Sequence, residues 1–121
     1  QRSKRKSISS ETTFETDENN FSELKKTLKS LSKGVSYRLK NSNMAAQTIV
    51  LKLKTSDFQN FTRTFTLSHP TQRAKTIYDT ALHLLSKEVV PHRKFRLLGI
   101  GLTKFTEPAD ADPPNILDLN L

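Results

Sequence analysis

The chain has 121 residues, no cysteine and a formal net charge of +8. A chain of this length fits one domain with a modest core. The lack of cysteine excludes disulfides and thiolate metal sites, and no apolar run approaches the about 18 residues that a membrane span needs. The N-terminal QRSKRKS is not followed by an apolar segment, so it does not have the form of a secretory signal.

The charge is unevenly distributed along the chain. All 20 lysines and arginines lie at or before Lys104, whereas four of the 12 acids follow it. Residues 1–105 therefore carry a net charge of +12, and residues 106–121 carry −4. A body this basic is typical of a protein that binds a polyanion such as nucleic acid, although a basic surface can also serve only to keep a small domain in solution.

Two elements are predicted in the first 40 residues. Residues 7–14 are rich in Ser and Thr, which favours a strand. Over residues 21–39 the apolar side chains recur at spacings of three and four, as on one face of a helix. Asn20 followed by Glu23 resembles a capping box at the start of this helix, and Gly34 is a weak point within it.

Two strands and a second helix are predicted next. Residues 47–54 alternate, which indicates a strand with one buried face and one basic face. Residues 61–67 are rich in Thr and Phe and predict another strand, joined to the first by a short hairpin-like connection. A helix is expected from the region of Pro70, since proline suits a first helical turn, to about Val89.

The last predicted strand, residues 94–104, contains the stretch RLLGIGL with Gly99 and Gly101. The order strand–helix–strand–strand–helix–strand predicts an α+β fold, with a four-stranded sheet and two helices on one face. The other face of the sheet is then open and carries Lys52 and Lys54. Both glycines are expected on this open face, where the missing side chains would let another backbone approach closely.

Signals for catalysis or metal binding are weak. The three histidines lack the spacing of metal ligands. Glu15, Asp17 and Glu18 precede a predicted helix, where acidic residues are explained by the helix dipole. No P-loop, nucleophile elbow or dinucleotide fingerprint is present. Basic and hydroxyl side chains interleave on the predicted strands instead, which suits contacts with phosphate oxygens without base recognition.

Five segments in register resemble the C-terminal "little finger" domain of Y-family DNA polymerases, in the branch of polymerases IV and kappa. They are KSISSETTF at 6–14, LKLKTSDF at 51–58, FTRTFTL at 61–67, TALHLL at 80–85 and FRLLGIGLTKF at 95–105. The resemblance implies a basic linker at 1–5, the little finger at 6–105 and a flexible acidic, proline-rich tail at 106–121. Its open sheet face would lie along duplex template–primer DNA and contact the phosphate backbone. The implied DNA-binding residues are Lys6, Ser7, Ser9, Lys54, Thr62, Arg63, Thr64, Arg96, Gly99 and Gly101.

The end of the tail resembles the family's peptide for the DNA polymerase sliding clamp (the beta clamp). Leu117, Leu119 and Leu121 match its leucine positions, and Ile116 replaces the usual glutamine. The implied clamp-binding residues are Ile116, Leu117, Asp118, Leu119 and Leu121.

The implied parent is a bacterial, cytoplasmic, nucleoid-associated translesion polymerase that acts in DNA damage bypass. Its catalytic palm, with its Mg²⁺, would lie outside this chain, so no catalytic residue, metal or cofactor is expected here. The remaining partner would be the polymerase's own core, and no membrane contact is expected. Two alternatives stay open: a module that mainly binds the sliding clamp, and a free-standing RNA-binding α+β domain.

Overall fold

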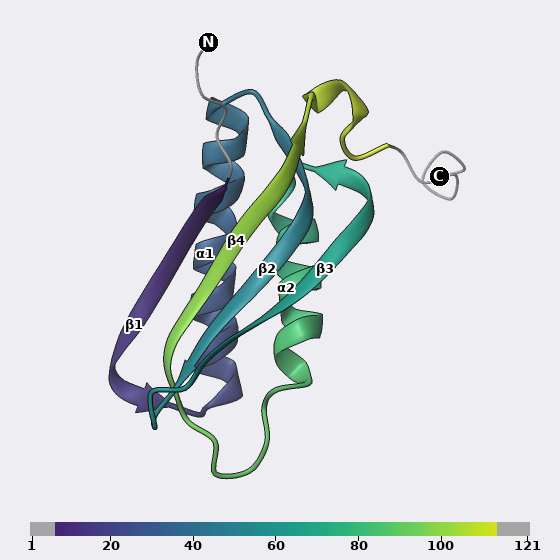
Figure 1. Cartoon of the computed structure of the whole chain (residues 1–121). Coiled ribbons are helices and arrows are strands. Elements are labelled where there is room, and N and C mark those ends of the chain that lie inside the picture. Colours follow the sequence, from purple (N-terminus) through teal and green to yellow (C-terminus); the bar gives the residue numbers. More distant parts are fainter. Residues whose placement is uncertain (1–6, 114–121) are drawn as a thin grey trace.

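Four strands and two long helices follow one another in the predicted order, strand–helix–strand–strand–helix–strand (Figure 1). The structure, a computed structural model, describes residues 7–113. The elements are β1 (Ile8–Glu18), α1 (Phe21–Asn41), β2 (Ala45–Thr55), β3 (Asn60–Thr71), α2 (Ala74–Ser86), β4 (Phe95–Thr106) and the 3-10 helix η1 (Pro108–Asp110). The four strands form one antiparallel sheet in the order β1-β4-β2-β3, so β1 and β3 are its edges. The predicted α+β fold is therefore confirmed.

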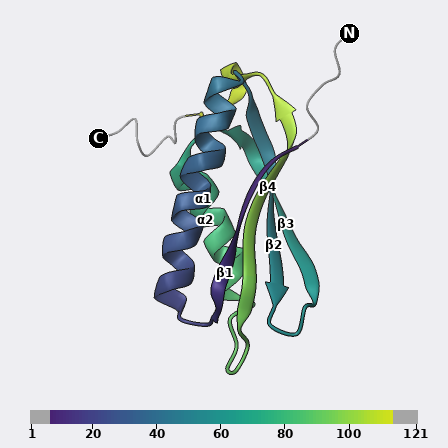
Figure 2. The same ribbon diagram turned by 90° about the vertical axis from the view of Figure 1, so that its left-hand side faces the viewer.

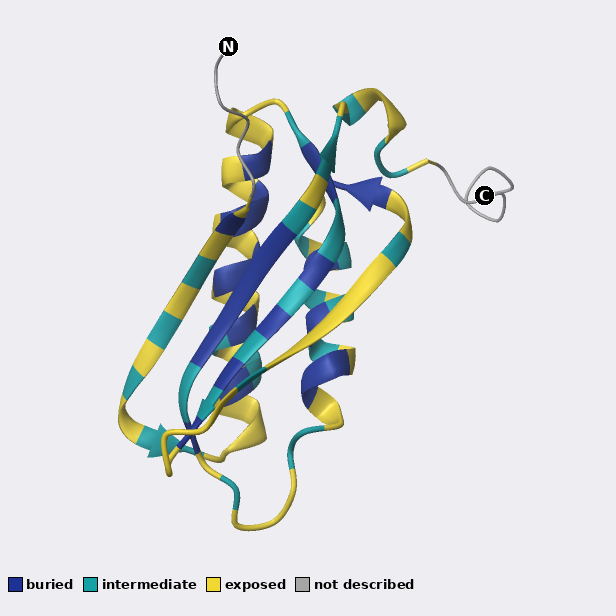
Figure 3. Cartoon of the chain, viewed as in Figure 1, coloured by how far each residue is buried: buried dark blue, intermediate teal, exposed yellow. Residues whose placement is uncertain are grey.

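Both helices lie against the same face of the sheet (Figure 2). The core fills the space between these two layers: burial alternates along β2, and β4 is buried without a break over its middle (Figure 3). In β4, Leu98, Ile100 and Leu102 are fully buried on the helix side. Among the described residues, neither helix has the length and apolar character needed to cross a membrane.

The start of α1 follows the predicted cap in part. The Asn20 side chain accepts a hydrogen bond from the Glu23 backbone N–H at 3.1 Å, as an N-cap residue does. In a capping box, the Glu23 side chain would in turn accept from the Asn20 backbone N–H. Here the Glu18 carboxylate accepts that bond, at 2.9 Å. Gly34 does not end the helix, which continues to Asn41.

The start of α2 differs from the prediction. Pro70 belongs to β3, and the helix begins only at Ala74 and ends at Ser86. The backbone N–H groups just before this helix are bound by side chains from two places. Thr71 Oγ1 accepts from the Arg73 N–H at 3.0 Å, and Asp112 Oδ2 accepts from the Gln72 N–H at 2.9 Å. A partner 40 residues away thus helps to place the helix start.

Candidate nucleic-acid interface

The strand register arranges the open face of the sheet in rows that cross all four strands. Residues directly opposite one another in antiparallel strands share a face. One row is Glu11, Gly99, Lys52 and Thr62. The next row is Ser9, Gly101, Val50 and Thr64, and the row on the other side is Thr13, Leu97, Lys54 and Asn60. These three rows are called the open face below.

The two glycines lie on the open face as predicted, but their backbone is buried in the free domain. A Cβ on Gly101 would come within 3.3 Å of the Lys52 Cε and 3.8 Å of its Nζ. A Cβ on Gly99 would come within 3.0 Å of the Glu11 Cβ. Neither glycine has a positive φ. Neither is therefore needed for backbone conformation. At Gly99 the neighbouring strand leaves no room for a side chain, whereas at Gly101 the space is used by the flexible Lys52 side chain.

Charge and hydroxyl groups surround this glycine pair. A hollow of about 450 Å³ next to it is lined by residues that include Lys52, Lys54 and Thr62. Glu11, on the same face, also lines this hollow. Lysine ammonium and threonine hydroxyl groups suit phosphate oxygens, whereas the Glu11 carboxylate repels them. The open face can therefore bind a phosphate backbone, with one built-in unfavourable charge.

Most of the residues predicted to face DNA come together here. The register brings Ser9, Lys54, Thr62, Thr64, Gly99 and Gly101 onto the open face. Ser7 is exposed directly before β1. Lys6 lies outside the described residues. Lys52 and Glu11 are two members of the open face that the implied site omitted, although the alternation in 47–54 already assigned Lys52 to this face.

Arg63 does not lie with them, so the structure contradicts its predicted place on the DNA face. It is opposite the buried Leu51, and its side chain is on the side of the sheet that the helices cover. Its Nε donates to the Glu88 carboxylate at 2.9 Å, and its guanidinium lies 4.8 Å from the centre of the Phe61 ring. Arg63 thus ties edge strand β3 to the segment after α2.

Arg96 lies at one end of the sheet, where the register of β2 and β4 shifts. Its guanidinium is 4.4 Å from the centre of the exposed Phe58 ring and 3.8 Å from an Asp17 oxygen. Its buried Nε has no hydrogen-bond partner within the described part of the chain. Arg96 is therefore held beside the β2–β3 turn rather than in the rows of the open face.

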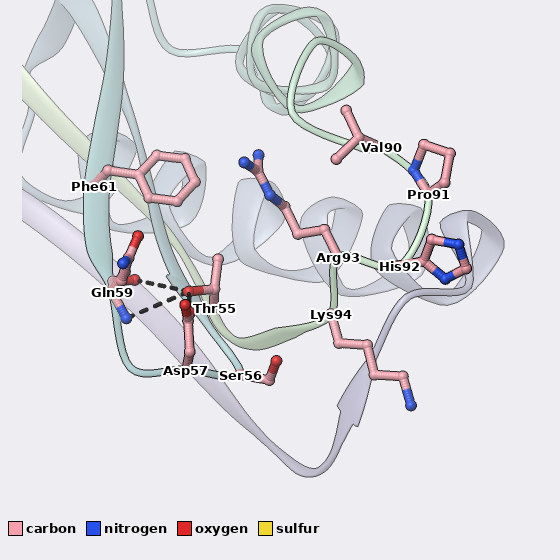
Figure 4. A pocket seen from close by; sticks show the side chains of 10 residues that line it. All are labelled: Thr55, Ser56, Asp57, Gln59, Phe61, Val90, Pro91, His92, Arg93 and Lys94. Atoms are coloured by element: carbon pink, nitrogen blue, oxygen red, sulfur yellow. Dashed lines mark hydrogen bonds between the residues drawn. The ribbon is translucent and has the colours of Figure 1, made fainter.

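A second hollow, of about 400 Å³, lies at this same end between the β2–β3 turn and the segment that leads into β4 (Figure 4). Thr55 Oγ1 bonds across the turn to the Gln59 backbone. Across the hollow, the Arg93 guanidinium lies 5.5 Å from the centre of the Phe61 ring and pairs with Glu88 at 3.3 Å. Arg93 thus joins the cluster of Phe61, Arg63 and Glu88, and its charge is already partnered.

The tail behaves differently from a free linker over the part that the structure describes. β4 runs to Thr106, η1 follows, and Asp112 bonds back to Thr71, Gln72 and the Pro70 carbonyl. The predicted clamp-binding residues, Ile116 to Leu121, lie outside the described residues. Among residues 7–113, no three His, Asp or Glu side chains gather as a metal site would require.

The sequence matches one protein family over residues 5–116, described as impB/mucB/samB family C-terminal domain. It is 47% identical over 114 residues to DNA polymerase IV 1 of Mesorhizobium japonicum and 49% identical over 114 residues to DNA polymerase IV of Brucella melitensis. Each of these alignments covers 94% of this chain. The chain spans only about a quarter of each relative's length, at 26% and 25%.

Solved structures share the fold at lower sequence identity. A Y-family DNA polymerase chimera superposes with a TM-score of 0.74 at 18% identity, over 84% of this chain and 29% of the chimera. The little finger domain of PolIV, solved in complex with the beta-clamp processivity factor, superposes with a TM-score of 0.66 at 23% identity. That match covers 90% of this chain and 92% of the other. The predicted resemblance to the little finger is confirmed at the level of family and fold.

Proposed function

The chain belongs to the impB/mucB/samB family as its C-terminal domain, and we propose that it grips template–primer DNA for a translesion DNA polymerase. The observation that carries this proposal is the open face itself. On one side of β4, which has no side chain at Gly99 and Gly101, lie β2 with Lys52 and Lys54 and, beyond it, β3 with Thr62; β1 with Ser9 lies on the other side. A duplex backbone could lie over β4, while the β2 lysines and the hydroxyls of Thr62 on β3 and Ser9 on β1 bind its phosphates.

In the free domain, the Lys52 side chain would cover the surface of β4 at Gly101 on which the DNA backbone is proposed to lie. This long, flexible side chain fills the space above Gly101 in the free domain. When a phosphate approaches, the ammonium can lift from the sheet toward it, because no ion pair holds Lys52 among the described residues. The lysine would then exchange contact with the strand for contact with DNA, without a rearrangement of the backbone.

In this proposal, the polymerase reaction takes place in a part of the protein outside this chain. The palm of the parent enzyme would hold Mg²⁺ and add nucleotides opposite damaged bases. This domain would hold the duplex through backbone contacts against that core, in the bacterial cytoplasm. Binding through charge and shape does not depend on the DNA sequence, which suits a polymerase that must act wherever a lesion occurs.

The test is binding of this chain to fluorescently labelled duplexes of unrelated sequence at two salt concentrations. We expect weak binding of equal strength for every sequence, with a steep loss between roughly 50 and 200 mM salt. A duplex affinity that does not change with salt concentration, or no detectable binding at low salt, contradicts the proposal. A strong preference for one sequence would point to base recognition instead.

A second function, binding of a sliding clamp, is favoured by the fold match to a little finger domain solved with a beta clamp. We propose that Ile116, Leu117, Asp118, Leu119 and Leu121 form the contact, as an extended peptide whose apolar side chains enter a pocket of the clamp. Capture of the clamp by this chain should be lost when residues 116–121 are deleted. Capture that survives the deletion would assign the contact to the folded body.

A further inference from the structure

A basic hollow of about 340 Å³ lies between the two helices, apart from the open face. It is lined by Lys29 and Lys33 of α1 and by Ala74, Lys75, Tyr78 and Asp79 of α2. Tyr78 packs against the core, so its ring and the Ala74 methyl supply apolar surface. Lys75 pairs with Asp79 at 3.0 Å. Lys29 and Lys33 are exposed and have no ion pair within residues 7–113.

The end of the described chain is anchored next to this hollow. Asp112 accepts from the Gln72 N–H at 2.9 Å, and its own N–H donates to the Pro70 carbonyl at 2.9 Å. The Arg73 guanidinium lies 4.0 Å from the same carboxylate. Ala74, the first residue of α2, already lines the hollow. Asp112, one residue before the end of the described chain, is therefore anchored just before the start of α2, whose first residues line the hollow.

We propose that residues 114–121 of the same chain bind in this hollow. The segment NILDLNL places Asp118 among four apolar side chains. The hollow is complementary to this segment, because the ammonium groups of Lys29 and Lys33 lie around the apolar surface of Tyr78 and Ala74.

Eight extended residues reach up to about 28 Å from their anchor. The hollow is near that anchor, because Ala74, which lines it, is two residues from the anchoring Gln72. A tether this short gives an effective concentration of the order of millimolar, so even a weak contact is populated.

Docking would keep the apolar peptide from the clamp until the clamp competes for it. This consequence rests on the proposed clamp contact, but the docking itself does not. Where the peptide is free for only a fraction of the time, its apparent affinity for a partner falls by that fraction. Removal of the docking site should therefore strengthen clamp binding by about two- to fivefold.

The direct test is paramagnetic broadening in the NMR spectrum of this chain. The chain has no cysteine, so Asn120→Cys gives a single site for a nitroxide spin label. We expect broadening of the amides around Lys29, Lys33 and Tyr78, and little at the edge strand β1. The doubly substituted Lys29→Glu/Lys33→Glu chain should lose this broadening while it keeps a folded spectrum.

The control is Lys26→Glu/Lys40→Glu, which makes the same charge change on exposed positions of the same helix outside the hollow. It also breaks the exposed pair of Lys26 with Glu23 at 3.3 Å, so its spectrum must show that the helix is intact. The control should keep the broadening. Broadening that is centred elsewhere, or that responds equally to both pairs of substitutions, overturns the docking. Failure of every variant to bind clamp would overturn the clamp contact alone, because the broadening decides the docking independently.

Discussion

Lys52 lies across Gly101, with its Cε 3.3 Å from the position that a Cβ on the glycine would occupy. The sequence alone suggested two empty positions on the open face. The structure shows that the end of the Lys52 side chain occupies one of them, the position over Gly101 where the DNA backbone is proposed to lie.

The two glycines should differ in their tolerance of a methyl group. Gly101→Ala meets the flexible end of Lys52, which can move aside, so its unfolding free energy should change by less than about 0.5 kcal/mol. Gly99→Ala meets the Glu11 Cβ at 3.0 Å and the Ser10 carbonyl oxygen at 3.3 Å. Such overpacking should cost about 1–3 kcal/mol in urea unfolding. Equal losses for the two variants would contradict the account.

Glu11→Gln should strengthen duplex binding. The substitution removes the acid from the row of Gly99, Lys52 and Thr62 and keeps the side-chain size. A few-fold gain at low salt is expected, and it should shrink as salt rises because screening weakens the repulsion. Glu23→Gln, on the exposed start of α1, is the control and should leave binding unchanged. Weaker binding by the Glu11 variant would argue against phosphates on this face.

Arg63→Ala should affect the fold more than DNA binding. The guanidinium holds Glu88 on the helix-covered side, in a pair that is partly exposed. Its loss should lower the unfolding free energy by up to about 1 kcal/mol. Duplex affinity should fall much less than for Lys54→Ala, as measured by fluorescence anisotropy. A larger loss of affinity for Arg63→Ala would place DNA near the cluster of Phe61, Arg63, Glu88 and Arg93.

Gly34→Ala should stabilise the domain. Gly34 lies inside α1, and no atom lies within 4 Å of the position that its Cβ would take. Alanine should therefore add about 1 kcal/mol through its helix propensity and a less flexible unfolded chain. Urea unfolding measures the gain. A loss of stability would indicate a contact at Gly34 with a segment outside the described residues.

The differences from the sequence prediction have definite physical causes. Alternation fixed the faces of β2, because its buried side is apolar and its other side carries lysine. Edge strand β3 is exposed over most of its length, so the pattern of FTRTFTL does not show which side Arg63 takes. The strand register determines the face of Arg63, because it places Arg63 opposite the buried Leu51.

Contacts between distant segments were also beyond prediction. The bond from Asp112 to the Gln72 N–H joins residues 40 apart. It anchors a segment whose prolines and acids are typical of a free linker. The start of α2 depends on the same contact, which explains why Pro70 was misplaced in the helix.

The salt dependence of duplex binding tests the central claim most directly. Lys54→Met and Lys40→Met each remove one lysine charge, the first from the open face and the second from the exposed surface of α1. If phosphates bind the open face, the slope of log K against log salt should become less steep by about 1 for Lys54→Met and stay unchanged for Lys40→Met. An unchanged slope for Lys54→Met, or an equal change in both variants, would contradict the assignment of DNA to the open face.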